Sequence, residues 1–150
     1  MAGTYTNLLY HLVFSTKNRI PLISASLQPD LYSYMGGIIR GEGGILLEIG
    51  GMPDHVHLLV KLKPTKSLSE MLNRIKAKSS KWVNEEKIKM RKFGWQDGYA
   101  AFSVSESQVD PLRQYIRDQE CHHRRQSYQE EFRALLERHG VEYEERYLWD

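Results

Sequence analysis

Cysteine is almost absent, with Cys121 as the single thiol among 150 residues. One thiol cannot form an internal disulfide or a cysteine-rich zinc site, which agrees with a reducing compartment and favours a small buried side chain at this position. No run of about 20 mainly apolar residues is present, so we expect no membrane-spanning helix. The first residues also lack the basic and apolar regions of a secretion signal, and we therefore expect a cytoplasmic protein with no membrane partner.

Excess charge of one sign is also missing overall, since the formal net charge is +2. The distribution is uneven, however: residues 61–92 hold eleven Lys or Arg and three acids, whereas residues 126–150 hold seven acids and three Arg. A basic segment favours a nucleic-acid partner, although a solvated lysine-rich helix has the same composition. The candidate phosphate contacts are Arg74, Lys78, Lys81, Arg124 and Arg125.

Hydrophobic spacing predicts strands near residues 5–14, 45–51, 52–62 and 99–104, and helices near residues 30–44 and 67–86. The resulting order, strand, helix, strand, strand, helix, strand, is typical of a ferredoxin-like α+β fold. Such a fold has an antiparallel sheet with helices on one face and the other face open. We expect one domain over residues 1–150, with a core at about 4–121 and a C-terminal helical appendage at about 126–150.

Two histidines interrupt the apolar pattern of the stretch "MPDHVHLLVKL". In an extended chain Val56, Leu58 and Val60 share one face, whereas His55 and His57 lie on the other. Side chains two residues apart lie roughly 6.6 Å from each other along a strand, so the two rings could hold one metal ion or one phosphate. The alternative is a pair of solvated histidines on an open sheet face.

A further helix is expected over residues 110–119, and it places Tyr115 and Gln119 four residues apart on one face. If this face meets the open side of the sheet, Gln119 can offer a third ligand and Tyr115 can point its hydroxyl at the group that the ion holds. A packed helix tyrosine is the alternative. Histidine ligands favour zinc or a late transition metal, whereas a phosphate-binding Mg²⁺ or Mn²⁺ site prefers oxygen. Glu48 and His11 are possible outer partners of this site.

The stretch "MPDHVHLLV" followed by "YIRDQ" resembles the single-tyrosine HUH transposases of small bacterial insertion sequences and their REP-associated relatives. Similar stretches are "YHLVFSTKNRIPLI", "FGWQDGYAAFSVS" and the last 29 residues. The resemblance implies a ferredoxin-like DNA nuclease and strand-transferase that acts on single-stranded or hairpin DNA without a nucleotide cofactor. It implies a 5′-phosphotyrosine on Tyr115 and a divalent metal, Mg²⁺ or Mn²⁺, on His55, His57 and Gln119. It also implies a homodimer, as in the insertion-sequence enzymes, although REP-associated members can be monomers.

Two other function classes stay open at this point. A non-catalytic module of the same fold would bind single-stranded or hairpin nucleic acid but form no covalent adduct. A small metal-dependent hydrolase would use water in place of Tyr115, so its turnover would survive the change Tyr115→Phe.

Overall fold

A four-stranded antiparallel sheet forms the frame of the protein, in a computed structural model that describes residues 3–87 and 91–149. The remaining parts of the predicted domain, residues 1–2, 88–90 and 150, lie outside the described residues. The strand order is β2-β3-β1-β4, which is that of a ferredoxin-like β-α-β-β-α-β unit and confirms the predicted fold class. The strands are β1 (Leu8–Ser15), β2 (Ile45–Met52), β3 (His55–Leu62) and β4 (Ala100–Val104).

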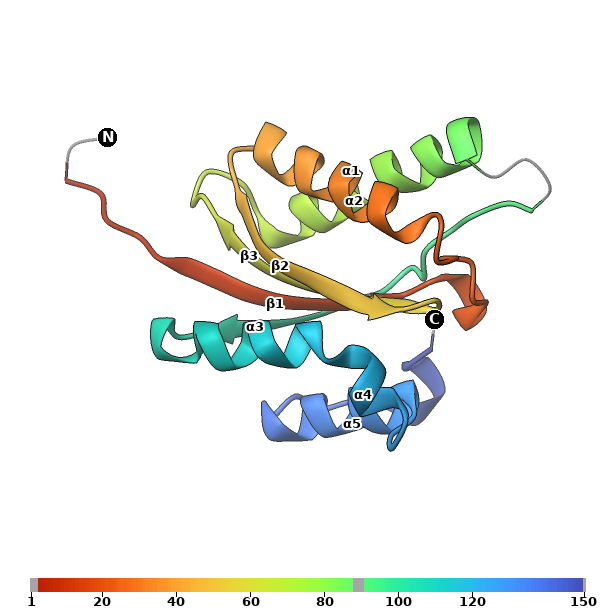
Figure 1. Cartoon of the computed structure of the whole chain (residues 1–150). Helices are drawn as coiled ribbons and strands as arrows, with labels where there is room; N and C mark the ends of the chain where they lie inside the picture. Colours follow the sequence, from red (N-terminus) through yellow and green to blue (C-terminus); the bar gives the residue numbers. More distant parts are fainter. Residues whose placement is uncertain (1–2, 88–90, 150) are drawn as a thin grey trace.

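Two helices cover one face of the sheet, α1 (Gln28–Gly41) and α2 (Leu68–Trp82) (Figure 1). Helix α2 begins with a side-chain cap, because the Ser67 hydroxyl accepts a hydrogen bond from the Glu70 amide at 3.2 Å. The main core lies between this helix pair and the sheet. Among the described residues no helix has the length and apolar character needed to span a membrane.

Strand β3 divides its side chains between two environments. Val56, Leu58 and Val60 are fully buried in the main core, as the alternation predicts. His55 and His57 project from the opposite face, and both are also fully buried. Strands β2 and β3 form an antiparallel hairpin, with Met52 paired to His55. The histidine strand is therefore held on both sides, by β2 and by β1.

The second face of the sheet is covered as well, by helices α3 (Val109–Arg117), α4 (Gln119–His123) and α5 (Tyr128–Arg138) (Figure 1). This differs from the expectation of an open face. The reason is a second apolar core, in which Phe132 and Leu135 of α5 pack with Val13 of β1 and Phe102 of β4. The C-terminal segment that we expected to be an appendage is thus a packed layer of the fold.

The expected single helix over residues 110–119 is interrupted at Asp118, where the backbone has φ −92° and ψ 22°. The amide of Asp118 still donates to the carbonyl of Gln114 at 3.1 Å, which closes α3, and α4 starts at the next residue. Cys121 on α4 is exposed, so the expectation of a buried thiol was wrong. It lines a surface cavity together with Gly50 and Gly51 of β2.

Helix α3 packs so closely on β2 that one position admits only glycine. A Cβ atom on Gly50 would lie 2.3 Å from the carbonyl oxygen of Ile116. We expect Gly50→Ala to lower the free energy of unfolding by about 1–3 kcal/mol, because the helix must move away. Gly37→Ala is the control, since its Cβ would meet nothing closer than 3.9 Å and should stabilise α1 by roughly 0.5–1 kcal/mol. Urea denaturation of both variants tests this, and equal stabilities would contradict the close packing.

Candidate active site

A buried carboxylate on α5 lies at the centre of a polar cluster beneath β3. The side chain of Glu131 is only 2% exposed. Its Oε1 atom lies 3.0 Å from Nε2 of His57, 3.2 Å from Nε2 of His123 and 3.5 Å from Nε2 of His55. Three imidazoles from β3 and α4 therefore face one oxygen atom of α5.

The second oxygen of this carboxylate joins the remaining predicted site residues. Oε2 of Glu131 accepts a short hydrogen bond from the Tyr115 hydroxyl and another, at 3.1 Å, from the Gln119 amide. The Gln119 carbonyl oxygen lies 3.2 Å from Nε2 of His55. The structure thus brings together His55, His57, Gln119 and Tyr115, and the break at Asp118 does not separate the last two.

The far ring nitrogens of the β3 histidines also have partners. Nδ1 of His55 is hydrogen-bonded to the Asp54 carboxylate at 2.8 Å, and Nδ1 of His57 to Nε2 of His11 at 2.9 Å. His11, named from the sequence as a possible outer partner, therefore does contact this cluster. These bonds fix the ring orientations and leave both Nε2 atoms directed inward.

Burial and neighbouring charge act in opposite directions on the three strand histidines. Burial lowers the pKa of His57 and, more strongly, that of His11. Burial also disfavours the cation at His55, but hydrogen bonds to the carboxylates of Asp54 and Glu131 outweigh it and raise the pKa of His55. Of these three, His55 is the one most readily protonated in the metal-free protein.

The phenol and the central carboxylate shift each other strongly. Burial would raise the pKa of Glu131, but hydrogen bonds from His123, His55 and His57 lower it far below its usual range. Burial and the nearby negative charge of Glu131 raise the pKa of Tyr115 well above its ordinary value of 10. The tyrosine is consequently a neutral phenol that donates to an ionised carboxylate.

Glu48 is placed elsewhere than expected. It accepts hydrogen bonds from Arg113 at 3.2 Å and from Arg117 at 3.1 Å, both on α3. The carboxylate therefore ties β2 to the helix that carries Tyr115, and the histidines have their other partners. Its contribution to the site is to hold this helix in place.

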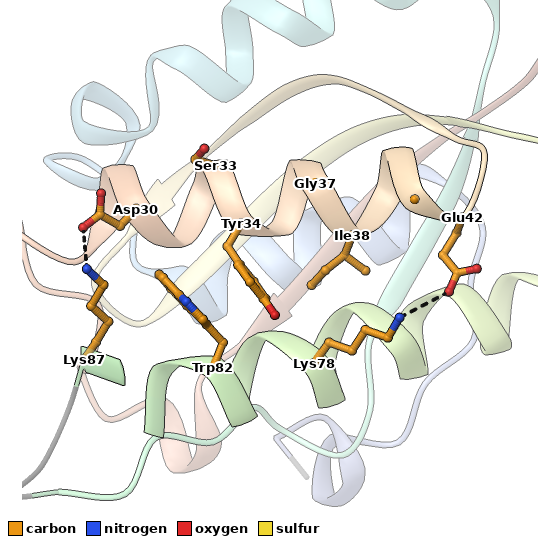
Figure 2. A pocket seen from close by; sticks show the side chains of 10 residues that line it. Asp30, Ser33, Tyr34, Gly37, Ile38, Glu42, Lys78, Trp82 and Lys87 are labelled. Atoms are coloured by element: carbon orange, nitrogen blue, oxygen red, sulfur yellow. Dashed lines mark hydrogen bonds and ion pairs between the residues drawn. The ribbon is translucent and has the colours of Figure 1, made fainter. Parts of the chain in front are cut away.

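The five candidate phosphate contacts separate into two groups. Arg74 and Lys78 lie on α2, across the sheet from the polar cluster, and both pair with Glu42, at 2.7 Å and 3.7 Å. Figure 2 shows Lys78 reaching across from α2 to that carboxylate, at the end of α1. Lys81 is exposed on the same helix. Arg124 and Arg125 instead follow α4 and line a surface cavity of about 520 Å³, on the same side of the sheet as Tyr115.

Two residues of the cluster escaped sequence analysis, His123 and Glu131. The sequence does contain a signal that Glu131 is buried. The apolar face of α5 consists of positions 128, 132, 135 and 136, and position 131 lies on the same face. A carboxylate within an apolar stripe needs a buried partner. His123 carries no comparable signal, since it lies in a run of mixed polar residues.

Comparison with known proteins identifies the family. A profile described as "Transposase IS200 like" matches residues 4–119. The chain belongs to the IS200-like transposases. Similar proteins include the ISDra2 transposase TnpA of Deinococcus radiodurans, 26% identical over 122 residues, which are 78% of this chain and 87% of the relative. The transposase for insertion sequence element IS200 of Salmonella typhimurium is 27% identical over 125 residues, 79% and 81% of the two chains.

Solved structures show the same fold. The crystal structure of a candidate transposase from Deinococcus radiodurans R1 superposes with a TM-score of 0.63 and 25% identity, covering 79% of this chain and 95% of that one. A REP-associated tyrosine transposase bound to a REP hairpin gives a TM-score of 0.60 at 14% identity, covering 82% and 73%. As a family member this protein is a DNA transposase. The family match ends at Gln119, so His123 and Glu131 lie beyond it.

The residues of this transposase fit the divalent metal that the family implies. Ligand atoms of His55, His57, His123 and Glu131 all lie within 4.8 Å of one another. Imidazole nitrogens and a carboxylate oxygen are common ligands of divalent ions. Metal-bound histidines typically donate a hydrogen bond from the far ring nitrogen, as Nδ1 of His55 does to the Asp54 carboxylate.

We expect Asp54→Asn to lower the pKa of His55 in the metal-free transposase, because the change removes a negative charge and a hydrogen bond that stabilise the imidazolium. The pH dependence of the His55 Cε1–H resonance in ¹H–¹³C NMR spectra measures this pKa. Asp97→Asn, at an exposed position away from the cluster, is the control and should leave the pKa unchanged. A His55 pKa that is the same in both variants would refute this assignment of the Asp54 bond.

Proposed function

We propose that this transposase cleaves and rejoins single-stranded or hairpin DNA through a covalent 5′-phosphotyrosine on Tyr115. A divalent ion held by His55, His57 and Gln119 would serve the reaction. The observation that supports this is the convergence of these four side chains, from β3, α3 and α4, on one buried cluster. The proposal places the reaction in the cytoplasm, where bacterial DNA is accessible.

The reaction conserves one phosphodiester-type bond at each step. The Tyr115 oxygen attacks phosphorus, the bond to the 3′ oxygen breaks, and the phenol proton ends on that leaving oxygen. Attack by a different 3′-OH reverses the step and joins new strands, so no ATP is needed. The ion, when bound, would stabilise the charge that develops on the non-bridging phosphate oxygens.

The hydrogen bond between Tyr115 and Glu131 controls the reactivity of the phenol. As long as the hydroxyl donates to this carboxylate, its oxygen is turned toward a negative charge and its pKa is raised. The bond must therefore break before the oxygen can reach a phosphate. Positive charge beside Glu131 would weaken this hold on the phenol.

A homodimer is part of the proposal on the strength of the family alone. Within one chain, Tyr115 already lies in the same cluster as the two β3 histidines and Gln119. Two copies would therefore hold two complete sets of these residues, one in each subunit.

Tyr115→Phe should abolish the covalent protein–DNA adduct, because the attacking oxygen is absent. The measurement is a denaturing gel of labelled single-stranded hairpin DNA incubated with Mn²⁺ or Mg²⁺. Tyr143→Phe, at an exposed tyrosine on the C-terminal segment, is the control and should form adduct normally.

Chelation of the metal should also abolish the adduct of the wild-type protein. Cleavage that survives Tyr115→Phe would instead indicate a hydrolase, and binding without an adduct in any metal would indicate a non-catalytic module.

Arg124→Ala combined with Arg125→Ala should weaken binding of single-stranded DNA, because these side chains lie on the side of the sheet that carries Tyr115. The slope of log K against log salt concentration should become shallower by about 0.7 for each phosphate that the variant no longer neutralises. Fluorescence anisotropy of labelled DNA measures both quantities. The matched control is Arg74→Ala with Lys78→Ala, on the opposite face, and a larger decrease in affinity there would contradict this placement.

A further inference from the structure

The cluster has a geometry that hydrogen bonding alone explains poorly. Three Nε2 atoms, from His55, His57 and His123, surround the same Oε1 atom of Glu131 at 3.0–3.5 Å. For each contact to be a hydrogen bond, each Nε2 must carry a proton. Rings directed at one point with inward Nε2 atoms are also the arrangement by which proteins hold a cation.

The side chain of Gln119 belongs to the same convergence. Its carbonyl oxygen lies 3.2 Å from Nε2 of His55 and 3.0 Å from Nε2 of His123. Nitrogen and oxygen atoms with lone pairs, from β3, α4 and α5, thus point at one small volume.

The charges of the cluster lead to the same conclusion. Asp54 and Glu131 contribute two negative charges, and Glu131 is almost fully buried. A buried carboxylate needs a compensating charge close by. One divalent cation balances both carboxylates while all the imidazoles stay neutral, which is the form in which histidine binds metals.

We propose that His123 and Glu131 are metal ligands in addition to His55, His57 and Gln119. The inference rests on the proposed function, because the ion is the one that serves that reaction. A site with three imidazole nitrogens favours Zn²⁺ or a neighbouring transition ion, whereas Mg²⁺ prefers oxygen ligands and water. This transposase should therefore select Zn²⁺, Co²⁺ or Mn²⁺ over Mg²⁺.

Both added ligands come from outside the stretch that matches the family. The match ends at Gln119, whereas His123 ends α4 and Glu131 lies in α5. A bound ion would connect α5 to β3 directly. Metal binding should therefore raise the thermal stability of the protein, and the increase should depend on Glu131.

Calorimetric titration of the chelator-treated full chain with ZnCl₂, MnCl₂ and MgCl₂ tests the ligand set. Glu131→Gln and His123→Ala should each weaken Zn²⁺ binding by on the order of a hundredfold. The controls are Glu130→Gln, which keeps the helix cap, and His139→Ala, at an exposed histidine. Unchanged Zn²⁺ affinity in Glu131→Gln and His123→Ala, or Mg²⁺ binding tighter than Zn²⁺ binding, would overturn the inference.

A second measurement does not depend on how well the variants fold. In the Co²⁺-loaded wild-type protein, each coordinated imidazole gives a strongly shifted ring N–H resonance. Three such resonances are expected, and only two would exclude His123.

The outcomes also separate this inference from the proposed function. Wild-type protein that forms the DNA adduct but shows two shifted resonances retains the function and refutes His123 as a ligand. Three resonances without an adduct retain His123 as a ligand and refute the function.

Discussion

The buried carboxylate of Glu131 is the interaction on which the second half of the structure depends. A carboxylate removed from water is costly by several kcal/mol unless charges or hydrogen bonds replace its hydration. Here one oxygen faces three imidazoles and the other accepts from a phenol and an amide. Because these donors come from β3, α3 and α4, satisfying a single side chain fixes α5 against three other elements.

Side chains on β3 point alternately to the two faces of the sheet, and this allows a small protein to contain both an apolar core and a buried polar cluster. One side of the strand fills the main core, and β1 and β2 pair with its edges, so the strand is anchored without the histidines. The other side is therefore free to carry histidines without loss of the fold. The second apolar core, around Phe102 and Phe132, lies beside the polar cluster, where the ring of Phe102 is next to His11. Chemistry and stability thus use opposite faces of the same strand.

Features with a short repeat were predictable from the sequence. The alternation around His55 and His57 and the helical spacing of α1 and α2 led to the correct fold, because local periodicity reports directly which side is buried. The spacing of Tyr115 and Gln119 put both on one helix face, and in the structure both side chains donate to Glu131. The position of α5 on the sheet was not predictable. The amphipathic pattern of a helix indicates which of its faces is buried, but not which part of the protein that face contacts. Glu42, which pairs with Arg74 and Lys78, is far from both in sequence, so these two side chains looked more available than they are.

The interruption at Asp118 has a mechanical consequence. Tyr115 belongs to α3 and Gln119 to α4, and different contacts hold the two helices. Helix α3 is held by the ion pairs of Glu48 and by its close contact with Gly50. Helix α4 is held by hydrogen bonds between Gln119 and the buried histidines. The phenol and the amide therefore reach the same carboxylate from two separately anchored helices. A change in the packing of α3 would act on the phenol and a change in the packing of α4 on the amide, with Asp118 as the residue between the two.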